Sequence, residues 1–345
     1  MNQKGFSIIE LLIALTLGLI ILASLIQVLL TTRQTSRLHS AFSQVQENGR
    51  VVMEYLAREI RATGYWGCAP SIASFTNHLD TSHSDYDPSL HDFTFATGIS
   101  GTDNDGFNGS DSITLSGLFG DSLPVIQAMP NTSAVVKVPP NNNLLFAGDV
   151  VFISNCKGGD IFQITAGNPQ STGVVGHNSG GSVRPGNAGS ICNTTGSSAC
   201  PNCFCQNYGL EATIHTGFNS SRYFIDNSSD GPTLFVDDFY SPPIALAIGI
   251  ENMQITYGVD TSGDGSANRY LEAGHSALDM QEVVSVKVNL LVRSSDDVLA
   301  APQTHRFNWE QRLAVNPLAN IETTATDRRL RRSYTMTVSI RNRIN

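Results

Sequence analysis

Glu10 is the only charged residue in an apolar run of about 25 residues that covers positions 6–30. A helix of that length exceeds the roughly 20 residues needed to cross a hydrocarbon core about 30 Å thick. A carboxylate at the bilayer centre costs about 2.5–3.5 kcal/mol, and an ammonium partner removes most of that cost. The sequence therefore predicts a membrane-spanning helix over 6–30 in which Glu10 has a functional role.

Two short motifs resemble enzyme signatures but lack the context that their chemistry requires. Ser122 lies in a GDSL string, yet that hydrolase chemistry needs a downstream DxxH, and the DxxH motif at positions 80–83 lies upstream. Cys200 and Cys203 form a CxxC motif in a glycine-rich segment, whereas a thioredoxin-type motif needs a preceding strand and a following helix. We therefore expect a non-catalytic protein, with a structural disulfide at the second motif.

Two acidic turns carry the oxygen ligands that calcium prefers. Asp260, Asp264 and Asn268 surround a glycine turn, and the segment 103–111 is a second candidate of the same kind. Neither turn has the spacing and closing glutamate of an EF-hand, and Asp, Asn and Gly are also ordinary turn residues. A structural calcium ion is thus a candidate cofactor, with a plain turn as the alternative.

Other charged clusters have a surface interpretation. The histidines and aspartates of the segment 78–92 are expected to form a solvated acidic loop, with a transition-metal site as the alternative. The four arginines between positions 328 and 332 could dock an acidic neighbour or contact DNA, and a solvated turn is an equal alternative. The formal net charge of the chain is −9, so the protein as a whole is not built to bind nucleic acid, and we do not expect nucleic acid as a partner.

The elements that must position these residues begin with a continuation of the first helix over 31–63. Apolar residues recur there at helical spacing and define one face, and Gly49 is a weak point within it. The positions are Leu38, Phe42, Val45, Val52, Leu56 and Ile60. Gly64 is the predicted C-terminal cap.

Strict alternation of apolar and polar residues predicts antiparallel strands in the C-terminal third, at 253–257, 284–292 and 334–340. Shorter strands are predicted at 112–116, 135–138 and 149–154. The segment from about 157 to 230 is rich in Gly, Ser, Asn and Thr and holds four cysteines, which predicts a loop-rich insertion stapled by disulfides. The expected fold is α+β: a long helix laid on an antiparallel sheet, with residues 64–345 forming a β-rich globular head.

The N-terminal segment resembles the class III signal of type IV pilins and pseudopilins. That resemblance implies removal of the leader 1–5 by a prepilin peptidase after Gly5 and N-methylation of Phe6. It also implies that Glu10 pairs with the N-terminal amine of a neighbouring subunit during assembly. The expected location is the inner membrane with the head in the periplasm, followed by the pilus on the cell surface.

Strings at both ends of the chain resemble PilW-family minor pilins. They are GYWGC (64–68), ENMQITYGVDTSGDG (251–265), VVSVKVNLLVRS (283–294) and DRRLRRSYTMTVSIRNR (327–343). The resemblance implies a pilin-like fold and a subunit that assembles with other minor pilins, the major pilin and the inner-membrane assembly machinery to prime and cap the pilus, supporting twitching motility. A minor pseudopilin of a type II secretion system and a pilus-tip adhesin are the alternatives.

Six cysteines in an exported head predict disulfides, although six cysteines allow fifteen connectivities. Cys68 and Cys156 are isolated in the sequence, and we expect them to pair. The remaining four are crowded and are expected to close on each other: Cys192, Cys200, Cys203 and Cys205.

Overall fold

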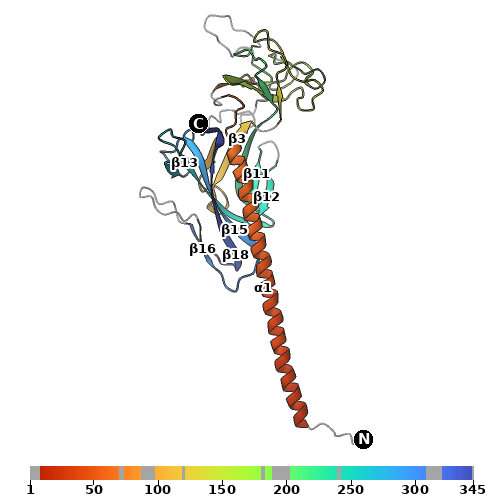
Figure 1. Cartoon of the computed structure of the whole chain (residues 1–345), viewed down its shortest axis with the longest axis vertical. Coiled ribbons are helices and arrows are strands. Elements are labelled where there is room, and N and C mark those ends of the chain that lie inside the picture. Colours follow the sequence, from red (N-terminus) through yellow and green to blue (C-terminus); the bar gives the residue numbers. More distant parts are fainter. Residues whose placement is uncertain are drawn as a thin grey trace.

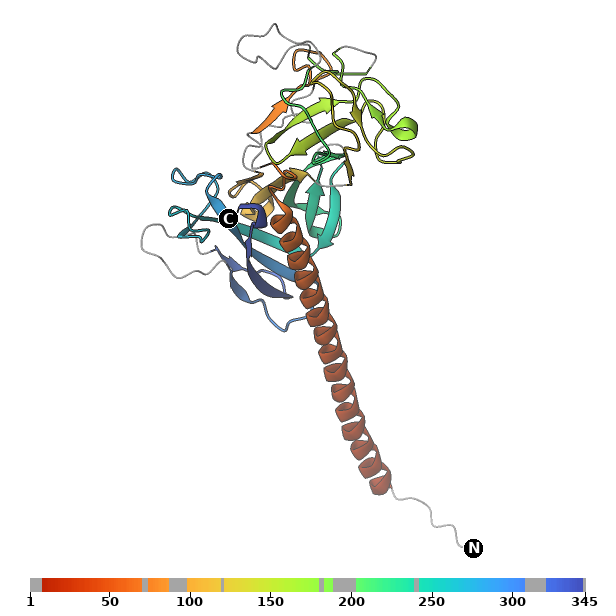
Figure 2. The ribbon, with the colours of Figure 1, turned by 45° about the horizontal axis from the view of Figure 1, so that its top comes forward.

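A single long helix carries a head on its C-terminal half. The computed structural model describes residues 8–69, 74–86, 98–118, 121–179, 183–188, 203–238, 242–307 and 321–343. Helix α1 (Ile8–Ala62) extends away from the head toward the N-terminus, and two lobes lie at its other end (Figures 1 and 2). At 55 residues and about 1.5 Å per residue, α1 is roughly 80 Å long.

The predicted continuation of the helix is confirmed, and its buried face begins at Ala41. Val45, Val52, Leu56 and Ile60 are buried, as the apolar spacing indicates. Leu38 and Phe42 differ from the prediction, because their side chains are 37% and 41% exposed. They flank Ala41, the first buried residue of the helix, and the guanidinium of Arg332 lies over the Phe42 ring, 5.3 Å from its centroid.

Gly64 ends the helix as predicted. It adopts a left-handed conformation with φ of 71°, which glycine reaches without the steric cost that other residues incur. Its backbone N–H donates to the carbonyl of Ser116 at 3.0 Å, and the N–H of Leu118 donates to the carbonyl of Tyr65 at 2.8 Å. The turn after α1 is therefore fixed to the end of a strand in the head.

The lobe nearest the helix contains two antiparallel sheets. The first has the order β14-β13-β15-β18 and consists of β13 (Ile250–Val259), β14 (Arg269–Leu271), β15 (Val283–Asp297) and β18 (Arg329–Ser339). The second has the order β12-β11-β10-β3-β2 and consists of β2 (Ile99–Thr102), β3 (Ser112–Leu118), β10 (Phe218–Ser228), β11 (Gly231–Asp237) and β12 (Ile244–Ile248). The three alternating segments of the C-terminal third are confirmed as β13, β15 and β18.

One apolar core joins α1 to both sheets of this proximal lobe. Leu56 and Ile60 of the helix belong to the same buried cluster as Ile255 and Val288 of the first sheet and Leu115 of the second. Every residue of strand β13 is buried, and its Asn252 and Gln254 side chains donate to carbonyls of the short 3-10 turn η2 (Phe107–Gly109). Near β18 lie a two-stranded ladder, β16 (Thr304–Phe307) with β17 (Ile321–Thr324), and the terminal turn η3 (Arg341–Arg343).

A distal lobe lies beyond the end of α1, farthest from the N-terminus (Figure 1). Its sheet has the order β1-β7-β6-β9-β4, with β1 (Phe75–Asn77), β4 (Ser122–Pro124), β6 (Val150–Asn155), β7 (Gly158–Gln163) and β9 (Thr213–His215). All pairs are antiparallel except β1 with β7. The ladder of β5 (Val136–Lys137) with β8 (Val174–Val175) and the short helix α3 (Pro169–Thr172) complete the lobe, which has its own apolar core.

All of the distal lobe except its edge strand β1, which precedes β3, is an insertion between two paired strands. β3 and β10 are antiparallel neighbours, with Leu118 opposite Phe218, and β4 to β9 lie between them in the sequence. This differs from the predicted loop-rich insertion over 157–230, because that range contains β7, β8, β9 and β10. The strands escape composition-based prediction because glycines occupy tightly packed positions: a Cβ at Gly159 would overlap the ring of Phe75.

Candidate functional site

The exposed half of α1 is the first candidate surface. The large apolar side chains between Ile8 and Leu30 are about half exposed or more, and α1 is long and apolar enough to cross a membrane. Glu10 lies within this half, also exposed, in the first turn of the helix. Gly5 and Phe6, where cleavage and methylation are expected, lie outside the described residues. The roles of Gly5, Phe6 and Glu10 therefore remain predictions.

Hydroxyl groups in this half of the helix are satisfied within the helix itself. Thr16 donates to the carbonyl of Ile13, and Ser24 donates to that of Ile20, each at 2.9 Å. Thr31 makes the same kind of bond to Gln27. Because each hydroxyl uses a carbonyl three or four residues earlier, these side chains can enter an apolar phase without an unpaired donor.

A disulfide fastens the end of α1 to the distal lobe. Cys68 and Cys156 are bonded across 88 residues, with Cα atoms 4.5 Å apart, and the predicted pairing is confirmed. Cys68 follows the turn after the helix, and Cys156 lies in the tight turn between β6 and β7. Trp66 and Phe152 belong to a small apolar cluster beside it. The bond therefore ties the distal lobe to the same turn that ends α1.

The other four cysteines are described only in part. Cys203 and Cys205 are both engaged in disulfides. Cys192 and Cys200 lie outside the described residues, so the closure of these four on each other remains a prediction. Because the sulfur of Cys205 is already bonded covalently, it is not a thiolate that could bind a metal.

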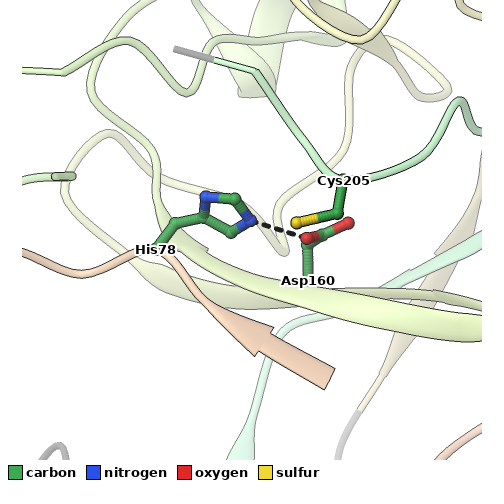
Figure 3. A group of neighbouring side chains, drawn as sticks. All are labelled: His78, Asp160 and Cys205. Carbon is green, nitrogen blue, oxygen red and sulfur yellow. Dashed lines mark hydrogen bonds and ion pairs between the residues drawn. The ribbon is translucent and has the colours of Figure 1, made fainter. Parts of the chain in front are cut away.

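A buried polar group lies beside Cys205 (Figure 3). His78 Nε2 is hydrogen-bonded to Asp160 Oδ1 at 2.6 Å. The hydroxyl of Tyr208 donates to Asp160 Oδ2. Burial and the neighbouring carboxylate raise the pKa of Tyr208. His78, Asp160 and Cys205 lie close enough to suggest a metal site, but both oxygens of Asp160 have protein partners. This group therefore holds the core of the distal lobe together, and the expected solvated loop is wrong for His78, which is buried.

The predicted calcium loop over 260–268 is a hydrogen-bonded turn. Asp260 accepts backbone N–H groups of Ser262, Gly263 and Gly265 at 2.7–2.9 Å. Desolvation is the largest single influence and raises the pKa of Asp260, but these hydrogen bonds together outweigh it and lower the pKa overall. Asn268 Oδ1 accepts the N–H of Thr261 at 2.7 Å. Asp264 Oδ1 accepts a backbone N–H within the same loop. The oxygens expected to bind calcium thus satisfy donors of their own loop.

The second acidic segment places one carboxylate in the core. Asp111 is buried and accepts the backbone N–H groups of Asn104 at 2.9 Å and Ile255 at 2.6 Å. Burial raises the pKa of Asp111 to about 7, although these two hydrogen bonds oppose the shift. Asp111 therefore joins β13 to the loop before β3 instead of facing a solvent-exposed ion site.

The arginine cluster has one buried member, Arg331, whereas Arg328 and Arg332 are exposed. Arg331 is 6% exposed and forms a bidentate pair with Glu251, at 2.5 Å and 2.8 Å. It also donates to Asp327 at 2.6 Å, and hydrogen bonding to Arg331 holds the pKa of Asp327 down at about 2. Arg332 lies over the rings of Phe42 and Tyr334. These contacts make Arg331 and Arg332 part of a joint between β18, β13 and α1, and the exposed members of the cluster remain at the surface, as a solvated turn would have them.

The residues of the hydrolase-like motifs make separate contacts. Ser122 is exposed on β4, where it pairs in register with His215 of β9. Asp80 accepts hydrogen bonds from Ser82, and His83 accepts the N–H of Asp85. None of the hydrogen bonds of Asp80 or His83 among the described residues reaches Ser122.

A close contact between α1 and β18, which the sequence did not predict, helps to fix the position of the helix. Gly49 is buried against the ring of Tyr334 on β18, and the Tyr334 hydroxyl donates to the carbonyl of Val45 at 3.2 Å. The glycine is thus a close-approach position and not a weak point in the helix. Its place on the apolar stripe was a signal that could have indicated this role.

Comparison with known proteins gives two family matches. Residues 1–26 match the prokaryotic N-terminal methylation motif, and residues 222–342 match the family of type IV pilus-assembly protein W, PilW. The second match begins within β10 and covers β11 to η3, so the distal lobe lies outside it. Neither a curated protein nor a solved structure matches the chain significantly. The two matches, with the membrane-length helix packed on antiparallel sheets, support a type IV pilus-related pilin whose C-terminal third is similar to the PilW family.

Proposed function

We propose that the protein is a minor pilin that assembles with other minor pilins to prime and cap the type IV pilus. The observation that carries this proposal is the continuity of α1, whose exposed apolar half follows a methylation motif and whose other half is built into the head. A pilin needs both halves, because the same helix anchors the precursor in the membrane and later packs against neighbouring helices. In this proposal the head is periplasmic before assembly and exposed on the pilus afterwards.

The N-terminal residues have three distinct roles in this proposal. The prepilin peptidase cuts after Gly5, Phe6 becomes the methylated terminus, and Glu10 pairs with the terminal amine of a neighbouring subunit. Pairing is favourable because a carboxylate in an apolar helix bundle is costly without a cationic partner. The protein acts by binding and not by catalysis, and its partners are other pilins and the inner-membrane assembly machinery.

A clean deletion of the gene tests the proposal against the pseudopilin alternative. We expect loss of surface pili and of twitching, with type II secretion unchanged, and recovery when the full chain is supplied in trans. A deletion strain with normal pili and defective secretion would show that the protein is a pseudopilin.

The distal lobe favours a second function, adhesion at the pilus tip. It has its own apolar core, it is fastened by disulfides, and it lies at the end of the molecule farthest from the membrane helix (Figure 2). Replacing residues 121–216 by a short linker tests this function. If the lobe is an adhesin, cells with this variant should lose surface attachment while their pili remain. If the lobe is needed for assembly, the pili should be lost as well.

A further inference from the structure

A pocket at the C-terminal end of α1 gathers three arginines. Its volume is about 420 Å³, and it is bounded by the last turn of α1, the end of β3 and the turn η3. Arg58, Arg61 and Arg341 provide the charge, and Tyr65 and Leu118 provide an apolar floor. The pocket is thus a local basic site on a chain whose formal net charge is −9.

Two of these three charges have no carboxylate partner among the described residues. Arg58 donates to Glu59 at 3.0 Å and 2.9 Å. No ion pair within the described ranges involves Arg61 or Arg341. The negative end of the helix dipole explains a cation in the last turn of α1. It does not explain a further guanidinium brought to the same place by the C-terminal segment.

The structure holds Arg341 in this position. The side-chain amide of Asn342 donates to the carbonyls of Ala62 at 3.4 Å and Thr63 at 3.1 Å, at the end of the helix. The backbone N–H of Ile340 donates to the carbonyl of Val284 at 2.9 Å. Like charges repel, so holding them together without an anion has an electrostatic cost that an incoming carboxylate would remove.

We propose that this arginine pocket docks an acidic segment of a neighbouring pilin subunit, with a carboxylate between Arg61 and Arg341. Guanidinium groups bind carboxylates in a bidentate geometry. The Tyr65 side chain is 43% exposed, and it offers a surface for an apolar residue next to that carboxylate. An apolar floor beside two cations fits a peptide better than a sugar-phosphate chain. The inference rests on the proposed pilin function and adds to it a charge-complementary contact.

The test uses the full chain with an affinity tag in its own cells. Membranes are solubilised in mild detergent, and the other pilins that are co-isolated are quantified by mass spectrometry. We expect R61E/R341E to lower the recovery of one pilin by about tenfold relative to the parent chain. The matched control is K157E/R269E, which makes the same change in net charge at two exposed positions outside the pocket and should leave recovery unchanged. Replacing acidic residues of the affected pilin by lysine should restore its recovery with R61E/R341E.

A second measurement does not depend on folding of the variant. Raising the ionic strength from about 0.05 M to about 0.5 M should lower recovery of the same pilin by the parent chain, because salt screens exposed charge pairs. Equal recovery by R61E/R341E and the control, or recovery by the parent chain that is insensitive to salt, would overturn the proposal. The proposal would also be overturned if R61E/R341E recovers the pilin normally but no longer binds a fluorescent single-stranded oligonucleotide, because that result would show that the pocket binds phosphate. If the parent chain itself recovers no pilin, the proposed function fails and not only the pocket.

Discussion

Replacing Gly49 by alanine perturbs the closest contact between α1 and the proximal sheet. A Cβ at this position would lie 2.7 Å or less from three ring carbons of Tyr334, closer than real Cβ contacts. The ring is held by the hydrogen bond from its hydroxyl to Val45, and the guanidinium of Arg332 lies 5.8 Å from its centroid. The methyl group therefore displaces a restrained side chain instead of entering free space.

The net effect follows from three opposing contributions. Overpacking costs about 1–3 kcal/mol, and loss of the Tyr334 hydrogen bond costs about 0.5–1.5 kcal/mol. Alanine gains about 1 kcal/mol over glycine in a helix interior. We therefore expect G49A to lower the free energy of unfolding by about 2 kcal/mol. With Y334A the obstruction is gone, so in that background G49A should raise the free energy of unfolding by up to about 1 kcal/mol.

Chemical denaturation of the full chain in detergent, followed by the fluorescence of buried Trp66, measures all four members of this double-mutant cycle. The reversal of sign is the critical result. If G49A stabilises the parent chain, or destabilises the Y334A chain equally, the packing argument is refuted.

Three further predictions concern the head. E251Q should lower the free energy of unfolding by about 3–5 kcal/mol, because it breaks a buried ion pair and leaves the charge of Arg331 poorly compensated. Replacing both partners by apolar residues (E251L/R331M) should lower it less, and chemical denaturation of the two variants distinguishes these outcomes. Burial raises the pKa of Asp111 to about 7 in the folded state, above about 3.9 in the unfolded state. The stability that Asp111 contributes is therefore present below about pH 4, and as the pH rises to 7 the free energy of unfolding should fall by at most about 4 kcal/mol. Denaturation at a series of pH values should show this fall, and D111N should remove the part of it that Asp111 causes. Replacing Cys68 and Cys156 by serine removes a disulfide that closes a loop of 88 residues, and in the chain-entropy model this closure stabilises the fold by about 4–5 kcal/mol. The abundance of the protein and the number of pili on the cells should therefore fall, as immunoblotting and electron microscopy would show. Unchanged abundance would contradict this prediction.

Local sequence patterns predicted the elements whose packing is regular. Helix α1 and strands β13, β15 and β18 have apolar residues at periods of 3.6 and 2, and these periods alone indicate which face is buried. The Cys68–Cys156 bond agreed with expectation because both residues flank packed elements.

The division of the head into two lobes had no such local signal. It depends on the pairing of β3 with β10, whose hydroxyl contact between Ser116 and Ser220 joins residues 104 positions apart. Strand β7 is fully buried but has the sequence GGDIFQ, in which Asp160 is tolerated only because His78 and Tyr208 bind it. Long-range partners of this kind decide burial, and composition does not reveal them.

The same reason explains the residues whose surroundings were misjudged. Arg331 belongs to a basic sequence cluster, and its burial depends on Glu251, 80 residues earlier. Asp111 belongs to an acidic turn, and its burial depends on Ile255. In contrast, the N-terminal motif around Gly5 and Glu10 is local, so sequence alone could indicate it.

The mature N-terminus of the protein in purified pili tests the central claim most directly. Sheared pili are digested, and the N-terminal peptide of this chain is identified by mass spectrometry. A PilW-family pilin should be present in that fraction and should begin with N-methylated Phe6. G5V should leave the full-length precursor in the inner membrane, and E10V should be processed but absent from pili. A chain in pili that still begins at Met1, or E10V incorporated at the parental level, would contradict the account.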